Sequence, residues 1–365
     1  MAVLLQASSE RGHLLVNAHS STKGLELVDL AFRYPDASRL AVDGFSLKVK
    51  PGELLCLLGP SGCGKTTILK AIAGLLKPTR GDIRMNGRSL AGIPTEKRGI
   101  GMVFQKPQLF PHLDVGANVG FGLRMRRIDP VLIRERVREM LHLVQLEGLE
   151  ERGVTEISGG QAQRVALARA LIIEPQVWLL DEPLSQLDAN LREEMRELIR
   201  SIQRKLGITT LFVTHDQEEA VVLGDRIGLI LEGRLHQIGT PPQLLETPAT
   251  VEVARFFGGH NQIEGIVKDD RFHCEAGTFR LPHPSGSGPA VMVIRQEGVV
   301  LGDGTNALSA RVDSARYMGT HQRVNLETGS LSLVMNAPSN QVFKPGQTIM
   351  VRFPPDRIWI IPSSV

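Results

Sequence analysis

The segment from Leu54 to Thr67 contains the residues best suited to chemistry in this chain. An apolar run, Leu54–Leu58, precedes a glycine-rich loop with the pattern G-x-x-x-x-G-K-T. Backbone N–H groups in such a loop point inward and bind phosphates, and a helix that starts there directs its positive end to the same anion. Lys65 can reach the β- and γ-phosphates, and the Thr66 hydroxyl can ligate magnesium. The alternative is a chance match to a glycine-rich turn, so the loop alone predicts a nucleoside triphosphate and nothing more.

A pair of carboxylates follows another apolar run. The run Val177–Leu180 is a predicted buried strand, and it places Asp181 and Glu182 at its C-terminal end. In a chain with a phosphate loop, the first acid is the expected magnesium partner, and its neighbour can orient and activate water. Acid pairs at strand ends also occur as structural features, so this pair gains its meaning only from the loop upstream.

Two further polar residues end predicted strands. Gln105 follows Ile100–Phe104, and His215 follows Thr209–Val213. Taken singly, the glutamine is a polar cap and the histidine a hydrogen-bonded structural residue. The carboxyl ends of parallel strands meet at one edge of a sheet, which is where ligands bind in open α/β folds.

A second anion-binding helix start is predicted at Ser158. Serine is a good N-cap, and the following Gly159 and Gly160 expose backbone N–H groups at the positive end of a helix. The alternative is a plain glycine-capped helix. Tyr34, which follows the predicted strand Leu25–Phe32, can stack on a base or simply cover the edge of a sheet.

These residues need an α/β scaffold. Buried strands alternate with amphipathic helices, including one from about Lys65 to Leu76 and a long one capped by Asp188. Residues from about 106 to 165 form a predicted helical insertion. After about residue 258, helical periodicity gives way to short alternating strands, which indicate a small β-barrel or sandwich. The expected fold is therefore a P-loop α/β domain, residues 24–258, followed by an all-β, OB-like domain, residues 259–365.

Composition excludes several classes of protein. The chain has 365 residues, long for a single domain, and a net charge of +3, too small to argue for nucleic acid. No apolar run approaches the ~18 residues of a membrane helix. Cys56, Cys63 and Cys274 lack metal-binding spacing and fit a reducing compartment. Residues 1–23 are predicted to be a loose extension.

Taken together, the motifs GPSGCGKT, Gln105, ISGGQ, VWLLDEP and His215 resemble the ATP-binding subunits of ABC transporters. Among these, the chain is similar to importer subunits served by a solute-binding protein, which share LFPHL, SGGQ-x-QRVALARAL, DEPLS-x-LDA and VTHDQEEA. The resemblance covers residues 25–258. The tail is similar, more weakly, to the β-barrel regulatory domain of importers for metals, oxyanions, polyamines and sugars.

The resemblance implies a role for each motif. Tyr34 would stack on adenine, Gln105 would link magnesium or water to the membrane partner, and residues 106–125 would grip that partner. Asp181 would bind magnesium, Glu182 would be the general base, and His215 would sense the γ-phosphate. The implied catalytic residues are Glu182, His215, Lys65 and Gln105. The implied magnesium ligands are Thr66, Gln105 and Asp181. The implied nucleotide-binding residues are Tyr34, Gly59, Pro60, Ser61, Gly62, Cys63, Gly64, Lys65, Thr66, Thr67, Gln105, Ser158, Gly159, Gly160, Gln161, Asp181 and Asp188.

The family pattern also implies partners and location. Two copies would bind ATP and Mg²⁺ head to tail, each covering the other's nucleotide, on the cytoplasmic side of the inner membrane. Two permease subunits and, indirectly, an extracytoplasmic binding protein would complete the importer, with no nucleic acid. Two positions depart from the family: Ile157 replaces the commoner leucine, and Gln186 occupies the dimer-contact turn in place of a small residue or asparagine.

Three other readings stay open from the sequence. An ABC ATPase without a permease would act on a nucleoprotein, although such proteins often carry two cassettes and this chain has one phosphate loop. A metabolic P-loop kinase would have no use for SGGQ. A nucleic-acid-binding tail would need more aromatic residues than this one has. The motifs do not identify the transported solute. The segments ISGGQ and DANLR slightly favour an importer of iron(III), polyamines or related small ions over an importer of sugars.

Overall fold

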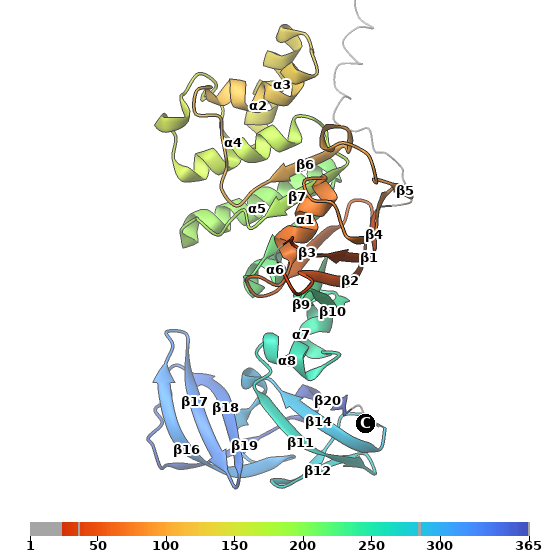
Figure 1. The fold of residues 1–365 in the computed structure, drawn as a ribbon. Helices are drawn as coiled ribbons and strands as arrows, with labels where there is room; N and C mark the ends of the chain where they lie inside the picture. Colours follow the sequence, from red (N-terminus) through yellow and green to blue (C-terminus); the bar gives the residue numbers. More distant parts are fainter. Residues whose placement is uncertain (1–23, 36, 284–285, 364–365) are drawn as a thin grey trace, which may run out of the picture. The chain divides into compact units, whose positions relative to one another are not determined.

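The computed structural model describes residues 24–35, 37–283 and 286–363, so the predicted extension at residues 1–23 lies outside the described part. The chain divides into two compact units, with the division between Ile238 and Gly239 (Figure 1). The sequence analysis placed this boundary about twenty residues later, near residue 258. No helix of the described residues is long and apolar enough to cross a membrane.

The first unit begins with an antiparallel sheet. Its strand order is β2–β1–β4–β5, with bounds Val42–Val49 for β2, Leu25–Phe32 for β1, Arg80–Met85 for β4 and Arg88–Ser89 for β5. Strand β1 alternates as the sequence predicts at its start, because Leu25 and Leu27 are buried while Glu26 is half-buried. This sheet provides one wall for the helix that follows the phosphate loop.

A second, six-stranded sheet places the motif-bearing strand ends along one edge. Its order is β10–β9–β3–β8–β7–β6, with bounds Arg234–Gly239, Arg226–Leu231, Leu54–Leu58, Thr209–Thr214, Val177–Asp181 and Ile100–Val103 in that order. The pairs from β9 to β6 are all parallel. Strands β3 and β7 are buried along their whole length, which explains their unbroken apolar runs.

Helix α1, Lys65–Ala73, packs its apolar face into a core shared by the two sheets. Ile68, Leu69 and Ile72 lie in that core with residues of β1 and β3. The helix ends three residues before the predicted end at Leu76, because Gly74 adopts a left-handed conformation with φ of 85°.

The predicted helical insertion is present as α2, Val115–Met125, and α3, Pro130–Leu143, which pack with α4, Gly159–Leu171. Figure 1 shows the three helices grouped together. The glycines in α2 permit close packing. A Cβ at Gly120 would lie 2.9 Å from Ile133 Cγ2, and one at Gly122 would lie 2.5 Å from Ile173 Cγ2.

Two more helices belong to this unit, and the second of them contacts β3 and β8 of the six-stranded sheet. Helix α5 spans Ala189–Leu206 and buries Met195, Leu198, Ile199 and Ile202 along one face, as the helical spacing predicts. It ends at Gly207, with φ of 58°. Helix α6, Gln217–Leu223, follows directly after β8.

The second unit contains two antiparallel five-stranded sheets around one apolar core. The strands of the first sheet, in spatial order, are β13 (Gly277–Arg280), β12 (Arg271–Cys274), β11 (Asn261–Lys268), β14 (Gly288–Ile294) and β20 (Ile358–Pro362). Those of the second are β15 (Val300–Leu301), β19 (Thr348–Arg352), β16 (Ala307–Tyr317), β17 (His321–Thr328) and β18 (Leu331–Pro338). The buried Asn261 side chain bonds the backbone of Val334 through both of its polar atoms and so joins the sheets. The predicted small all-β domain is confirmed.

Two short helices, α7 (Pro241–Glu246) and α8 (Val251–Phe256), belong with this second unit. Ala254 packs against Val293 and Ile361, and Trp359 Nε1 donates a hydrogen bond to Pro248 O at 2.9 Å. These contacts explain why the boundary lies before the helices rather than after them, where the composition changes.

Candidate functional site

A cleft of about 410 Å³ opens where the phosphate loop, the strand ends and the first sheet meet. It gathers motifs that lie far apart in the sequence. Its lining consists of Tyr34, Ala41, Ser61, Gly62, Gly64, Lys65, Thr66, Thr67, Gln105, Asp181 and Glu182.

The phosphate loop needs glycine for two different reasons. At Gly59 a Cβ would lie 2.2 Å from Ile230 O, so no side chain fits. Gly64 has φ of 101°, a conformation that L-residues rarely adopt, and a Cβ there would lie 2.7 Å from Ala41 O. The loop therefore passes close to neighbouring backbone and leads directly into α1.

Lys65 is 4% exposed, and its ammonium group is held inside the loop. Its Nζ donates to Gly59 O at 2.7 Å and to Pro60 O at 2.9 Å, and lies 3.8 Å from Cys63 Sγ. The positive charge is thus fixed beneath the cleft by backbone carbonyls. Cys63 is itself buried, and burial raises the pKa of its thiol against the lowering effect of the Lys65 charge.

Thr66 and Asp181 form the oxygen pair that a magnesium ion would need. The Thr66 hydroxyl donates to Asp181 Oδ1 at 3.0 Å. Burial raises the pKa of the Asp181 carboxyl, the Thr66 hydrogen bond lowers it, and the Glu182 charge raises it. The described residues contain no cluster of three or more His, Cys, Asp or Glu side chains suited to a metal. One carboxylate and one hydroxyl fit Mg²⁺, which keeps waters and binds through substrate phosphates.

Glu182 lies at the centre of the polar contacts in the cleft. Its Oε1 is 4.0 Å from Lys65 Nζ, and its Oε2 is 3.1 Å from His215 Nδ1. Its backbone is left-handed, with φ of 46°, a conformation that is uncommon for a non-glycine residue and often marks a functional site. Two hydrogen bonds hold this conformation: Glu182 N donates to Val213 O at 3.0 Å, and Ser185 Oγ donates to Glu182 O at 2.9 Å.

Gln105 and Tyr34 lie at the borders of the cleft. Gln105 Nε2 donates to Ser185 Oγ at 3.2 Å, which links the end of β6 to the turn after β7. The Tyr34 hydroxyl lies 2.9 Å from Thr67 Oγ1, and its ring packs edge-on against Phe32. Tyr34 is 42% exposed, so its side chain is accessible from the cleft that it lines.

The remaining predicted binding residues do not line this cleft. Ser158 and Gln161 form a capping box at the start of α4: Gln161 N donates to Ser158 Oγ at 3.2 Å, and Ser158 N donates to Gln161 Oε1 at 2.9 Å. Asp188 caps α5 by accepting from Leu191 N at 3.0 Å. Within one chain these residues serve as helix caps, and Gly159 and Gln186 are exposed.

The structure adds residues around the segment 106–125 that the motifs did not indicate. The fully buried Asn118 accepts from Phe110 N and donates to the carbonyls of Phe110, Leu113 and Asp114. Arg169, on α4, donates to Pro107 O and Gln108 O and lies 5.4 Å from the centre of the Phe110 ring. The sequence did not single out Asn118 or Arg169. Their hydrogen-bond partners are backbone groups, and such contacts leave no pattern in the residue types.

Family models match parts of both units of this chain. The model of the ABC transporter family matches residues 42–185, and that of the TOBE domain matches residues 292–361. An Fe(3+) ions import ATP-binding protein of Photorhabdus laumondii is 41% identical over 323 residues, which are 87% of this chain and 91% of the relative. A spermidine/putrescine import ATP-binding protein of Borrelia garinii is 38% identical over 92% of this chain and 98% of the relative.

Solved structures resemble the first unit. CbiO1 of Clostridium perfringens, part of the ABC transporter complex cbiONQ, has a TM-score of 0.57 and 33% identity, and the match covers 61% of this chain and 90% of that one. The ATP-binding cassette MJ0796, solved as a dimer in a post-hydrolysis state with ADP and Pi, has a TM-score of 0.55 and 31% identity, and covers 60% of this chain and 98% of that one.

The fold and the cleft define a P-loop nucleoside triphosphatase of the ABC type. The chain belongs to the family of ABC transporter import ATP-binding proteins that carry a C-terminal TOBE domain. Proteins of this family bind ATP and are ATPases coupled to solute import.

Proposed function

We propose that two copies of this chain bind two ATP molecules between them, with Mg²⁺, and hydrolyse ATP to drive uptake of iron(III) or a polyamine. The observation that carries the proposal is the separation of two anion-binding features. The cleft supplies Lys65, Thr66, Asp181 and Glu182 but not the helix start at Ser158. A head-to-tail pair of chains would allow each cleft to be covered by the other copy's Ser158.

The region around Gly159 supports this pairing. Nothing lies within 4 Å of the position that a Cβ of Gly159 would take, so packing within the chain does not require glycine there. A bare backbone is required where a ligand or a second chain must approach closely. The solved MJ0796 cassette, which is 31% identical, is a dimer with ADP and Pi.

In this proposal each residue of the cleft has a physical task. Tyr34 stacks on adenine, and the backbone N–H groups of residues 61–67 bind the phosphates. The charge of Lys65 offsets negative charge that develops on the γ-phosphoryl oxygens. Magnesium, when bound, would neutralise further charge on the phosphates, and Thr66, Asp181 and Gln105 would hold it.

Hydrolysis depends on Glu182 and His215. Glu182 accepts a proton from the attacking water as the water oxygen bonds to the γ-phosphorus and the bond to the β–γ bridging oxygen breaks. His215, 3.1 Å from Glu182, orients that carboxylate and contacts the γ-phosphate. Loss of the shared γ-phosphate removes a contact between the two copies, so the dimer relaxes.

The segment 106–125 carries this motion to a permease in the proposal. Asn118 and Arg169 hold its backbone in one conformation, which suits a surface that must contact a partner. The chain would lie peripherally on the cytoplasmic side of the membrane with two permease subunits, while an extracytoplasmic binding protein selects the solute. Relatives that import Fe(3+) or spermidine/putrescine favour those two classes of solute.

An uptake experiment tests the proposal. Cells that lack the chromosomal copy would receive either the wild-type chain or Glu182→Gln, and uptake of radiolabelled iron(III) and spermidine would be measured. We expect either iron(III) or spermidine to enter the cells that carry the wild-type chain and not the cells that carry Glu182→Gln. Equal uptake of both solutes with the two chains would overturn the assignment of solute, and unchanged phosphate release by purified Glu182→Gln would overturn the role of the carboxylate.

A further inference from the structure

A small cavity beside the cleft contains an ion pair that the proposed reaction does not use. The cavity has a volume of about 100 Å³, and its lining includes Glu182 and His215 together with Arg192 and Glu219. Arg192 lies on α5 and Glu219 on α6. Neither residue lines the cleft that contains the phosphate loop.

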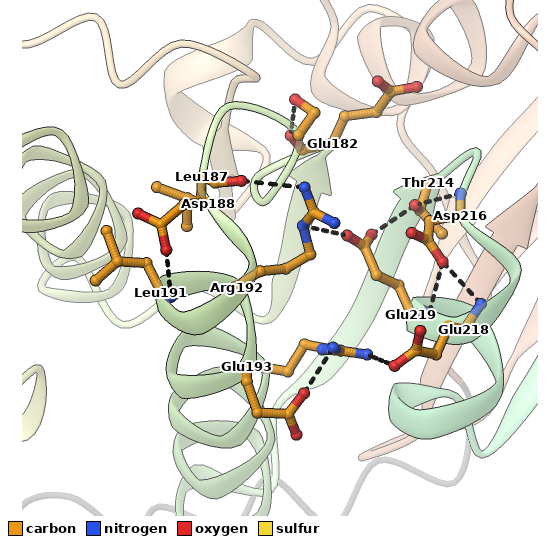
Figure 2. Close-up of polar contacts among 12 residues, drawn as sticks. Glu182, Leu187, Asp188, Leu191, Arg192, Glu193, Thr214, Asp216, Glu218 and Glu219 are labelled. Carbon is orange, nitrogen blue, oxygen red and sulfur yellow. Dashed lines mark hydrogen bonds and ion pairs between the residues drawn. The ribbon is translucent and has the colours of Figure 1, made fainter. Parts of the chain in front are cut away.

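A continuous set of contacts runs from the turn 184–188 to the backbone around His215 (Figure 2). Arg192 Nη2 donates to Leu187 O at 3.0 Å, and Arg192 Nε lies 3.9 Å from Glu219 Oε1. The Thr214 hydroxyl donates to Glu219 Oε2 at 2.6 Å and accepts from Asp216 N at 2.9 Å. The residues on both sides of His215 are therefore fixed by this set of contacts.

Arg192 and Glu219 lie close together, but no hydrogen bond joins them. Arg192 Nε is buried and makes no hydrogen bond, and the distance of 3.9 Å is longer than a hydrogen bond. Glu219 is 4% exposed. Burial raises the pKa of its carboxyl, while the Thr214 hydrogen bond, Arg192 and Arg196 favour the charged form. A buried carboxylate without a cation is costly, so displacement of Arg192 would disturb Glu219.

We propose that Arg192 is a positioning residue that transmits the position of the turn 184–188 to His215 through Glu219 and Thr214. The inference rests on the proposed function, with the turn that contains Gln186 contacting the second copy of the chain, as the resemblance to the family implies. Closure of the dimer would then place His215 and Glu182 correctly for hydrolysis. ATP binding in the cleft does not involve this set of contacts, so it should not depend on Arg192.

The chain offers matched controls. Arg196, one helical turn further along α5, also joins α5 to α6, because its Nη1 donates to Glu218 Oε1 at 2.8 Å. It makes no hydrogen bond to Leu187 or Glu219 among the described contacts, although its charge also favours the ionised form of Glu219. Arg200 pairs with Asp225 at 2.5 Å. Substitution of either residue by alanine removes an ion pair of α5 and leaves in place the hydrogen bonds that join Leu187, Arg192, Glu219, Thr214 and Asp216.

The test compares kcat for ATP hydrolysis with the Kd for a fluorescent ATP analogue in the full-length protein. Displacement of a reacting group by about 1 Å can cost ~100-fold in rate, so we expect Arg192→Ala to lower kcat at least ~10-fold. Its Kd should stay within about twofold of wild type, and kcat of Arg196→Ala and Arg200→Ala within about threefold. Adding Glu219→Gln to Arg192→Ala should produce no further loss, because the two residues act in series.

Arg192→Lys separates positioning from simple charge balance, and it serves as the test if Arg192→Ala does not fold. Lysine keeps the positive charge near Glu219 but lacks the planar fork that can bond Leu187 O and Glu219 together. We expect kcat of Arg192→Lys to remain below wild type. Full recovery by lysine, an equal loss in Arg196→Ala, or a loss of ATP affinity that matches the loss of kcat would overturn the inference. Absence of hydrolysis by the wild-type protein would instead overturn the proposed function.

Discussion

At the scale of single residues, the cleft combines a fixed positive charge with carboxylates in different environments. Lys65 is held by backbone carbonyls, so its charge is in place before the nucleotide arrives. Asp181 is buried beside Thr66, whereas Glu182 contacts His215. The different surroundings suit a metal ligand and a general base respectively.

Substitution of Lys65 by alanine should remove charge stabilisation of the reacting phosphoryl group. Loss of one pre-positioned donor at a reaction centre typically lowers kcat about 100- to 1,000-fold, and we expect a loss of that size with weaker ATP binding. Steady-state phosphate release and titration with a fluorescent ATP analogue measure the two effects. The exposed Lys77→Ala serves as the control. Turnover that equals wild type in Lys65→Ala would refute the role of the lysine.

Asp181→Asn should change stability with pH in a defined direction. Because the pKa of the Asp181 carboxyl is raised in the folded chain, its contribution to stability is present below the ordinary value of 3.8 and is lost as pH rises through the folded pKa. Asparagine does not ionise, and its amide oxygen can still accept from Thr66. In EDTA without nucleotide, Asp181→Asn should therefore gain free energy of unfolding relative to wild type as pH rises from 4 to 8.

Urea denaturation at several pH values measures this difference. Mg²⁺ with ATP should reverse it, because in the proposed function the Asp181 carboxylate is a ligand of the metal. A difference in the free energy of unfolding between Asp181→Asn and wild type that stays constant from pH 4 to 8 in EDTA would contradict the assignment of the raised pKa.

At the scale of elements, parallel strands and short helices place the chemistry. The strands β3, β6, β7 and β8 end at one edge of the six-stranded sheet, so four distant motifs meet there. The insertion adds a surface segment whose conformation depends on Asn118 and Arg169.

Asn118→Ala should loosen that segment without affecting the cleft. The substitution removes the Asn118 amide, which bonds the backbone groups of Phe110, Leu113 and Asp114. We expect this to lower the free energy of unfolding by about 1–3 kcal/mol. Hydrogen exchange should accelerate in residues 107–114, while ATP affinity is retained. Asn325→Ala, an exposed amide in the second unit, is the control. Unchanged exchange in residues 107–114 would contradict this account.

The motif-bearing strands were predictable because burial on both faces leaves an unbroken apolar run, as in Leu54–Leu58. The helical insertion was also predictable, but the bounds of α2 were not, because its glycines weaken helix propensity and are explained only by close packing against Ile133 and Ile173. Arg192 reads as a solvent-facing residue of an amphipathic helix. Its partners, Leu187 O and Glu219, depend on how α5 and α6 come together, which the spacing of residues does not reveal.

At the scale of the whole molecule, the chain consists of two units with separate cores. The family motifs end before the unit boundary, whereas the change in composition comes after α7 and α8. These helices pack on the second unit through Ala254 and the carbonyl of Pro248.

A fragment that starts at Gly239 should therefore be more stable than one that starts at Gly259. The shorter fragment loses the packing of Ala254 and the hydrogen bond from Trp359. Since 1 kcal/mol shifts Tm by about 4–8 °C in a domain of this size, we expect a difference of several degrees. Circular dichroism during heating measures it, with far-UV spectra as the control for folding. Equal Tm values would place the boundary where composition suggested, near residue 258.

The central claim is that ATP joins two copies of this chain, each completing the other's site. Glu182→Gln keeps the shape of the cleft but removes the base, so ATP should bind and persist. Light scattering on this variant with saturating MgATP should give the mass of two chains, against one chain of 40.0 kDa without nucleotide or with MgADP. A variant that stays at the mass of a single chain while saturated with ATP would contradict the account.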